Sequence, residues 1–163
     1  MGSSKRRRFK VQNIAFKWSK QKKFLGAAWV LRNNRGESLL HSRRAFGNIG
    51  SFVEEKFTTW MWAIESIRSH HVDKVIFEAE FSDLLGAVKR QRDWPTLRYQ
   101  GSELRKALGD LRGWSFRVIE SRTNRCAGAI AKSVTQERWS QSYVAQGNPA
   151  WLKELFEADK QGS

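Results

Sequence analysis

The sequence lacks the features that define secreted and membrane-spanning proteins. It contains one cysteine, Cys126, so no internal disulfide can form. No apolar run approaches the roughly 18 residues that a membrane-spanning helix needs, and the N-terminus has no apolar stretch of the kind that a secretory signal carries. With three histidines and a single cysteine, the sequence also contains no zinc-binding motif. We therefore expect an intracellular protein that does not contact a membrane.

Proline is scarce as well, with two residues in a chain of 163. Large aromatic side chains are not scarce, because eight Trp and ten Phe are available to fill a core. A composition with 40% hydrophobic residues is not that of a disordered chain. The length suits one folded domain with a substantial core.

Acidic residues are missing from the first 36 positions, which hold eleven Lys and Arg side chains. The formal net charge of the chain is +14, and most of that excess comes from this N-terminal region. Such a concentration of positive charge favours contact with a polyanion, and above all with nucleic acid. The alternative is a basic arm that only increases solubility. The run KRRR at 5–8 also resembles a nuclear import signal, so we expect a nuclear rather than a cytoplasmic location.

The periodicity of apolar residues predicts an α/β fold. Three strands come first, followed by helices and strands in alternation, which predicts a five-stranded mixed sheet flanked by helices. In the first helix, Trp62 lies opposite the apolar face, where it would pack against a second helix or, as the alternative, face a ligand. The predicted strands are 9–18, 25–32, 37–46, 74–80 and 114–120, and the predicted helices are 52–69, 82–91, 98–111 and 123–137.

We divide the chain into three parts. A basic N-terminal arm covers residues 1–8, and the folded domain covers residues 9–140. A C-terminal tail covers residues 141–163 and contains a short amphipathic segment, in which Trp151, Leu152, Leu155 and Phe156 recur at helical spacing.

Several segments in this order resemble the ribonuclease H type 1 superfamily, and most closely its plant retroelement-derived, reverse-transcriptase-like members. The matching segments are GAAWVLRNNRGESLLHSRRAF at 26–46, FTTWMWAIESIRSHHVDKVIFEAEFSDLLGAV at 57–88, WPTLRYQGSEL at 94–104 and NRCAGAIAKSV at 124–134. The resemblance implies a ribonuclease H-like fold. It also implies cleavage of the RNA strand of an RNA/DNA hybrid by two Mg²⁺ ions held on four carboxylates.

Carried over position by position, the resemblance also implies that this metal site is degenerate. The four ligand positions fall on Ala15, Lys56, Glu80 and Gly128, so one carboxylate remains. One carboxylate cannot hold two divalent cations, and the ammonium group of Lys56 would repel them. Lys56 could instead neutralise Glu80 directly. A shift of one residue in the helix would place Glu55 at the second position, but it would leave Ala15 and Gly128 unrepaired.

Nucleic-acid contacts are predicted for the arm, for the first hairpin, for a basic cluster after the second helix and for the start of the last helix. An ordinary solvated surface is the alternative for each of these groups. The candidate residues are Lys5, Arg6, Arg7, Arg8, Lys17, Lys20, Lys22, Lys23, Lys89, Arg90, Arg92, Arg122 and Arg125.

Three functional hypotheses follow. The first is a catalytically inactive ribonuclease H-like domain that binds nucleic acid, as an RNA/DNA hybrid or another duplex, and needs no cofactor. The second is a protein-interaction adaptor on the same scaffold, with residues 151–156 as its docking segment. The third is a metal-dependent ribonuclease with an altered site around Glu80 and Glu78, and only this hypothesis requires Mg²⁺.

Overall fold

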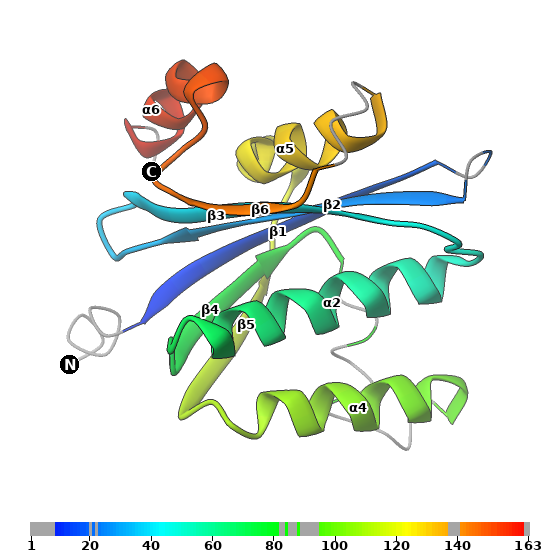
Figure 1. The fold of residues 1–163 in the computed structure, drawn as a ribbon. Helices are drawn as coiled ribbons and strands as arrows, with labels where there is room; N and C mark the ends of the chain where they lie inside the picture. Colours follow the sequence, from blue (N-terminus) through cyan, green and yellow to red (C-terminus); the bar gives the residue numbers. More distant parts are fainter. Residues whose placement is uncertain are drawn as a thin grey trace.

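The chain folds into one mixed β-sheet with helices on both faces, and the computed structural model of it is shown in Figure 1. The strands lie side by side in the order β5-β4-β1-β2-β3-β6. Their bounds are β1 Lys10–Ser19, β2 Phe24–Arg32, β3 Ser38–Phe46, β4 Lys74–Ala79, β5 Gly113–Val118 and β6 Tyr143–Gln146. The structure describes residues 9–19, 21, 23–81, 84, 88, 95–136 and 141–161.

The strand directions confirm the predicted fold class. Strands β1, β2 and β3 form an antiparallel meander, while β4 runs parallel to β1 and β5 runs parallel to β4. The sheet has one strand more than expected, because β6 from the C-terminal tail pairs antiparallel with β3. This strand is only four residues long, and a segment that short has too few alternations to be recognised in a sequence. Gly147 ends it with a φ of +66°, a conformation that favours glycine.

Helices cover both faces of the sheet (Figure 1). On one face lie α2, Phe52–Ser69, and α4, Arg98–Leu108, and on the other lie α5, Arg125–Gln136, and α6, Lys153–Gln161. The Ser51 side chain accepts a hydrogen bond from the backbone N–H of Glu54, which caps the first turn of α2. The predicted helix 82–91 lies outside the described residues, except for Leu84 and Val88, which are both buried. Among the helices of the described segments, none is long and apolar enough to cross a membrane.

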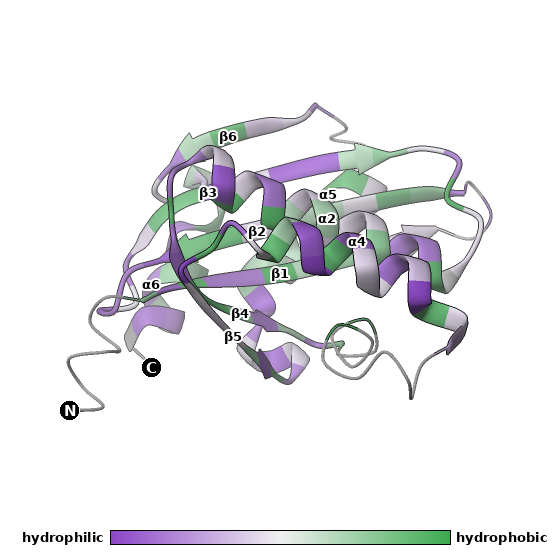
Figure 2. Ribbon diagram, turned by 90° about the horizontal axis from the view of Figure 1, so that it is seen from below, coloured by the Kyte–Doolittle hydropathy of each residue, from purple (hydrophilic) through white to green (hydrophobic). Residues whose placement is uncertain are grey.

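The sheet separates two hydrophobic cores of different character. The core under α2 and α4 is built from large side chains, among them Trp29, Trp60 and Phe77. In Figure 2, which views the molecule from this side, hydrophilic and hydrophobic segments alternate along α4, as expected of a helix with one buried face. Trp62 contacts Trp29 and Phe46 of the sheet, with ring centroids 6.3 and 6.0 Å apart. Trp62 therefore packs against the sheet, and the expectation that it packs against a second helix is wrong. The sequence pattern was misleading because α2 is buried on more than one face.

The core under α5 is built from small side chains, and Leu152 and Phe156 from the predicted amphipathic segment close it. Gly26 of β2 shows how closely α5 approaches the sheet. A Cβ atom at this position would come within 2.5 Å of the Ala131 carbonyl oxygen and within 2.7 Å of the Val134 Cβ. Gly128 of the same helix differs, because a Cβ there would meet nothing within 4 Å.

This difference predicts opposite effects of two glycine-to-alanine substitutions. We expect Gly26→Ala to lower the free energy of unfolding by about 2–3 kcal/mol, since α5 must move away from the sheet. We expect Gly128→Ala to raise it by about 0.5–1 kcal/mol, since alanine favours the helix interior and has room here. Urea denaturation of both variants measures the two changes. A neutral Gly26→Ala variant would contradict the close packing of α5 on β2.

Candidate functional site

Three of the four positions singled out by the resemblance meet at the start of α5. Asn124, which is buried, donates from Nδ2 to the Ile14 carbonyl oxygen at 2.8 Å and to Glu80 Oε2 at 3.4 Å. Ala15, the next residue of β1, packs against the small residues of α5. The end of β4, the middle of β1 and the start of α5 therefore converge on Asn124.

Gly128 lies one helical turn beyond Asn124, and its backbone N–H donates to the Asn124 carbonyl oxygen at 2.9 Å. The space beside its Cα is open. A Cβ atom at this position would meet nothing within 4 Å, so the position where the resemblance expects a carboxylate has free space beside it. Among these three positions, Glu80 is the one with an acidic side chain.

Lys56, the fourth position, lies on α2. Trp60 follows it by one turn on the same helical face, and the Trp60 ring contacts Phe77 and Phe81 with centroid separations of 5.7 and 5.6 Å. This face of α2 is therefore directed at the end of β4, from which Glu80 follows. A direct pairing of Lys56 with Glu80 stays a prediction.

Glu55 precedes Lys56 and is buried, with 1% of its surface exposed. Its Oε2 atom has no hydrogen-bond partner. Burial raises the pKa of Glu55 to about 7, and the nearby Lys56 ammonium only partly opposes this shift. Glu55 is the carboxyl that a one-residue shift of the alignment would bring into the site. It thus lies inside the fold and stays protonated to a higher pH than an ordinary glutamate. Within the described segments, no group of three or more His, Cys, Asp and Glu side chains is placed to hold a metal ion.

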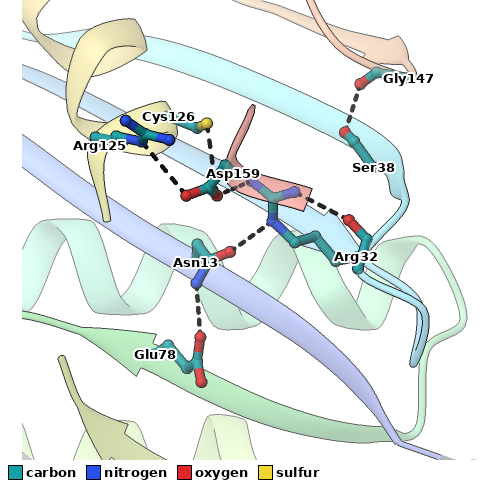
Figure 3. Close-up of polar contacts among 9 residues, drawn as sticks. Asn13, Arg32, Ser38, Glu78, Arg125, Cys126, Gly147 and Asp159 are labelled. Atoms are coloured by element: carbon teal, nitrogen blue, oxygen red, sulfur yellow. Dashed lines mark hydrogen bonds and ion pairs between the residues drawn. The ribbon is translucent and has the colours of Figure 1, made fainter. Parts of the chain in front are cut away.

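A buried chain of polar contacts runs across the same sheet face (Figure 3). Asn13 donates from Nδ2 to Glu78 Oε1 at 2.8 Å and accepts at Oδ1 from Arg32 Nε at 3.0 Å. Arg32 donates from Nη2 to Asp159 Oδ2 of α6, also at 3.0 Å. The Arg32 guanidinium is 10% exposed, so the Asp159 carboxylate supplies the opposite charge that burial demands.

Asp159 also joins α6 to the start of α5. Its Oδ1 lies 3.5 Å from Arg125 Nε, and its Oδ2 lies 3.7 Å from the Cys126 sulfur (Figure 3). Burial, together with the Asp159 charge, raises the pKa of the Cys126 thiol to about 11. A thiol with so high a pKa is not a nucleophile at neutral pH, so Cys126 contributes packing rather than chemistry.

Of the predicted nucleic-acid contacts, four fall on described residues. Lys17 and Lys23 lie at the β1–β2 hairpin, whereas Arg122 and Arg125 lie at the start of α5. The hairpin end of β2 packs near Val134, so the length of α5, on the order of 15 Å, separates the two pairs. The structure therefore does not bring these four into one cluster. The other candidates, Lys5, Arg6, Arg7, Arg8, Lys20, Lys22, Lys89, Arg90 and Arg92, lie outside the described residues.

Sequence reasoning missed the polar chain. Arg32 was visible as a charge at the end of an otherwise apolar strand, which often indicates a buried ion pair. Its partner Asp159 lies 127 positions away in the tail, and no spacing rule connects the two residues.

The comparisons with known proteins agree with the fold described above. A family model described as reverse transcriptase-like matches residues 13–134, which is more than half of the chain. No curated protein matches the chain significantly.

Solved structures match the fold over most of the chain. The RNase H1 of Halobacterium salinarum aligns with a TM-score of 0.68 at 15% identity, covering 78% of this chain and 98% of that one. The N-terminal RNase H domain of a Mycobacterium tuberculosis protein aligns with a TM-score of 0.61 at 12% identity, covering 79% and 97%. LC11-RNase H1, solved in complex with an RNA/DNA hybrid, aligns with a TM-score of 0.60 at 15% identity, covering 72% and 90%.

The raised pKa of Glu55 predicts how stability depends on pH. An acid whose pKa is higher in the folded state than in the unfolded state destabilises the fold as pH rises between the two values. Glu55→Gln removes this titration. We expect its effect on the free energy of unfolding to be about 2 kcal/mol more stabilising at pH 8 than at pH 4.5. Urea titrations at both pH values measure this difference. Glu65→Gln, an exposed residue on the same helix, is the control. A pH-independent effect at Glu55 would show that this carboxyl titrates normally.

Proposed function

Because the chain belongs to the reverse transcriptase-like family of ribonuclease H-like domains, we propose that it binds nucleic-acid duplexes, RNA/DNA hybrids foremost, and does not cleave them. The observation that carries this proposal is the composition of the site around Asn124. Three positions that the resemblance gives to metal ligands lie near Asn124, and two of them, Ala15 and Gly128, have no side-chain oxygen to offer.

The ligands that two-metal hydrolysis requires support the proposal that the protein does not cleave its duplex. Such a reaction needs several oxygen ligands around cations that lie about 4 Å apart. Glu80 alone offers two oxygens, and Asn124 already donates to one of them. Glu55 is buried and its pKa is about 7, so it is poorly suited to replace a missing ligand. We infer that the protein functions without Mg²⁺.

The net charge and the structural similarity to a hybrid-binding protein support the proposal that the protein binds duplexes. The formal net charge of +14 gives a strong, sequence-independent attraction to phosphate backbones. One of the structurally similar proteins, LC11-RNase H1, was solved with an RNA/DNA hybrid. We place the contacts on the arm 1–8, on the first hairpin and on the start of α5. The run KRRR at 5–8 also underlies our expectation of a nuclear location.

The first experiment measures binding and cleavage on one labelled RNA/DNA hybrid. We expect fluorescence anisotropy to report binding without metal, with a preference for the hybrid over matched double-stranded DNA. We expect no RNA cleavage after long incubation with Mg²⁺ or Mn²⁺, whereas an active ribonuclease H cuts the same hybrid. Cleavage that disappears in Glu80→Ala would establish the altered metal site instead. Absence of binding would favour the protein-interaction adaptor.

The basic arm makes a second, separate prediction. We expect removal of residues 1–8 to weaken binding and to flatten the slope of log affinity against log salt. The magnitude of this negative slope should decrease by about three to four, if all four basic side chains contact phosphates of double-stranded DNA. A variant with Lys5, Arg6, Arg7 and Arg8 all replaced by Gln keeps the length and should behave in the same way. An unchanged slope in both variants would show that the arm makes no phosphate contacts.

A further inference from the structure

A cavity of about 800 Å³ lies beside α6, on the sheet face away from α2 and α4. Its walls are the β2–β3 turn at 33–36, the end of α6 and the turn Ser121–Thr123 that leads into α5. The metal-ligand positions of the ribonuclease H resemblance did not point to this cavity, because none of Ala15, Lys56, Glu80 and Gly128 is among its lining residues. Cavities of this volume are typical of sites for small organic ligands.

Apolar side chains form part of the cavity lining. Val11 of β1 and Ile76 of β4 are paired neighbours in the sheet, and both are only partly buried. The Phe9 ring lies beside Gly113, where a Cβ atom would come within 3.2 Å of the ring. These three residues line the cavity together and offer a flat apolar surface of the kind on which a planar ring can lie.

The rest of the lining is strongly basic. Six basic side chains and three acidic ones line the cavity, a formal excess of three positive charges. The basic side chains are Arg32, Arg35, Arg117, Arg122, Arg125 and Lys160, and the acidic ones are Glu78, Glu120 and Asp159.

The three acids are already engaged by these same cations. Asp159 pairs with Arg32 and Arg125, as described above. Glu78 lies 3.5 Å from the Arg117 guanidinium and also accepts from Asn13. Glu120 Oε2 lies 2.6 Å from Arg122 Nε. The acids therefore offset about half of the positive charge, and an anion entering the cavity would meet a net positive field.

Two further features favour an anion. Within the described part of the chain, Arg35 makes no ion pair, and it is exposed on the β2–β3 turn at the cavity wall. Helix α5 begins at Arg125 and has no acid of its own in its first turn, so its own side chains do not offset the positive end of its dipole.

We propose that this cavity binds a nucleoside phosphate, with the base on Phe9, Val11 and Ile76 and the phosphate held by Arg35, Arg117 and Arg122. Guanidinium groups suit phosphate because their planar forks donate paired hydrogen bonds. An apolar surface beside an arginine-rich wall matches a ligand that is flat and apolar at one end and doubly charged at the other. This site goes beyond the proposed duplex binding. The ligand is either a free mononucleotide or the phosphorylated end of a strand.

The test is calorimetric titration of the full chain with adenosine 5′-monophosphate, at low salt and without metal. We expect saturable binding, and binding at least about tenfold weaker for adenosine and for inorganic phosphate, since each lacks one half of the ligand. The variant Arg35→Ala/Arg117→Ala/Arg122→Ala should lose at least about tenfold in affinity, since it removes charged hydrogen-bond donors. These three arginines are exposed, so the variant should keep its fold, which a thermal melt checks.

Arg112→Ala is the matched control, because Arg112 is exposed and pairs with Asp73 at the opposite end of β5. We expect it to bind the nucleotide like the unaltered chain. Equal affinities of the triple variant and this control would overturn the proposal, as would absence of binding to the unaltered chain. Inorganic phosphate that binds as tightly as the nucleotide would overturn it too, since the apolar surface would then contribute nothing.

Competition then identifies the source of the ligand. A short single strand with a 5′-phosphate should displace the mononucleotide, and the same strand with a 5′-hydroxyl should not, if the site takes strand ends. If neither strand displaces it, the site takes free mononucleotides. The calorimetry uses no duplex and the anisotropy experiment uses no mononucleotide, so each proposal can fail without the other.

Discussion

The close approach of α5 to strand β2 is the constraint on which the site depends. Gly26 leaves no room for a side chain beneath Ala131, and alanines make up much of the core between α5 and the sheet. Because α5 lies so near the sheet, Asn124 at its start can reach the Ile14 carbonyl oxygen and Glu80 together. The position of the site is thus set by packing between small residues, and it does not require a metal ion to hold the strand ends and the helix together.

The loss of the metal site that we propose is compatible with an intact fold, because this packing does not depend on the side chains at the ligand positions. Several carboxylates at one point repel one another and are stabilised chiefly by the metal ions between them. Alanine and glycine at two of these positions remove that repulsion and leave the packing of α5 intact. Arg32 is a buried charge of the described part of the chain, and Asp159 and Asn13 satisfy it.

Much of this architecture follows from the sequence, because the long elements carry regular periodicity. The helix Phe52–Ser69 and the β1–β2–β3 meander could be predicted within one or two residues. Strand β6 could not, because four residues carry no clear pattern. The convergence of Ala15, Glu80 and Gly128 followed from the family resemblance alone. The pairing of Arg32 with Asp159 and the cavity beside α6 needed three-dimensional coordinates, since the residues involved are brought together only by the fold.

The Arg32–Asp159 pair joins two residues that lie far apart along the chain, and this separation matters while the protein is synthesised on the ribosome. Arg32 emerges among the first strands, whereas Asp159 emerges 127 residues later. Until α6 has left the exit tunnel, the nascent sheet holds an arginine with no carboxylate to meet it, and strand β3 has no β6 along its outer edge. Contacts between residues so far apart in the chain form late in folding. Completion of this domain is therefore tied to the translation of its last helix.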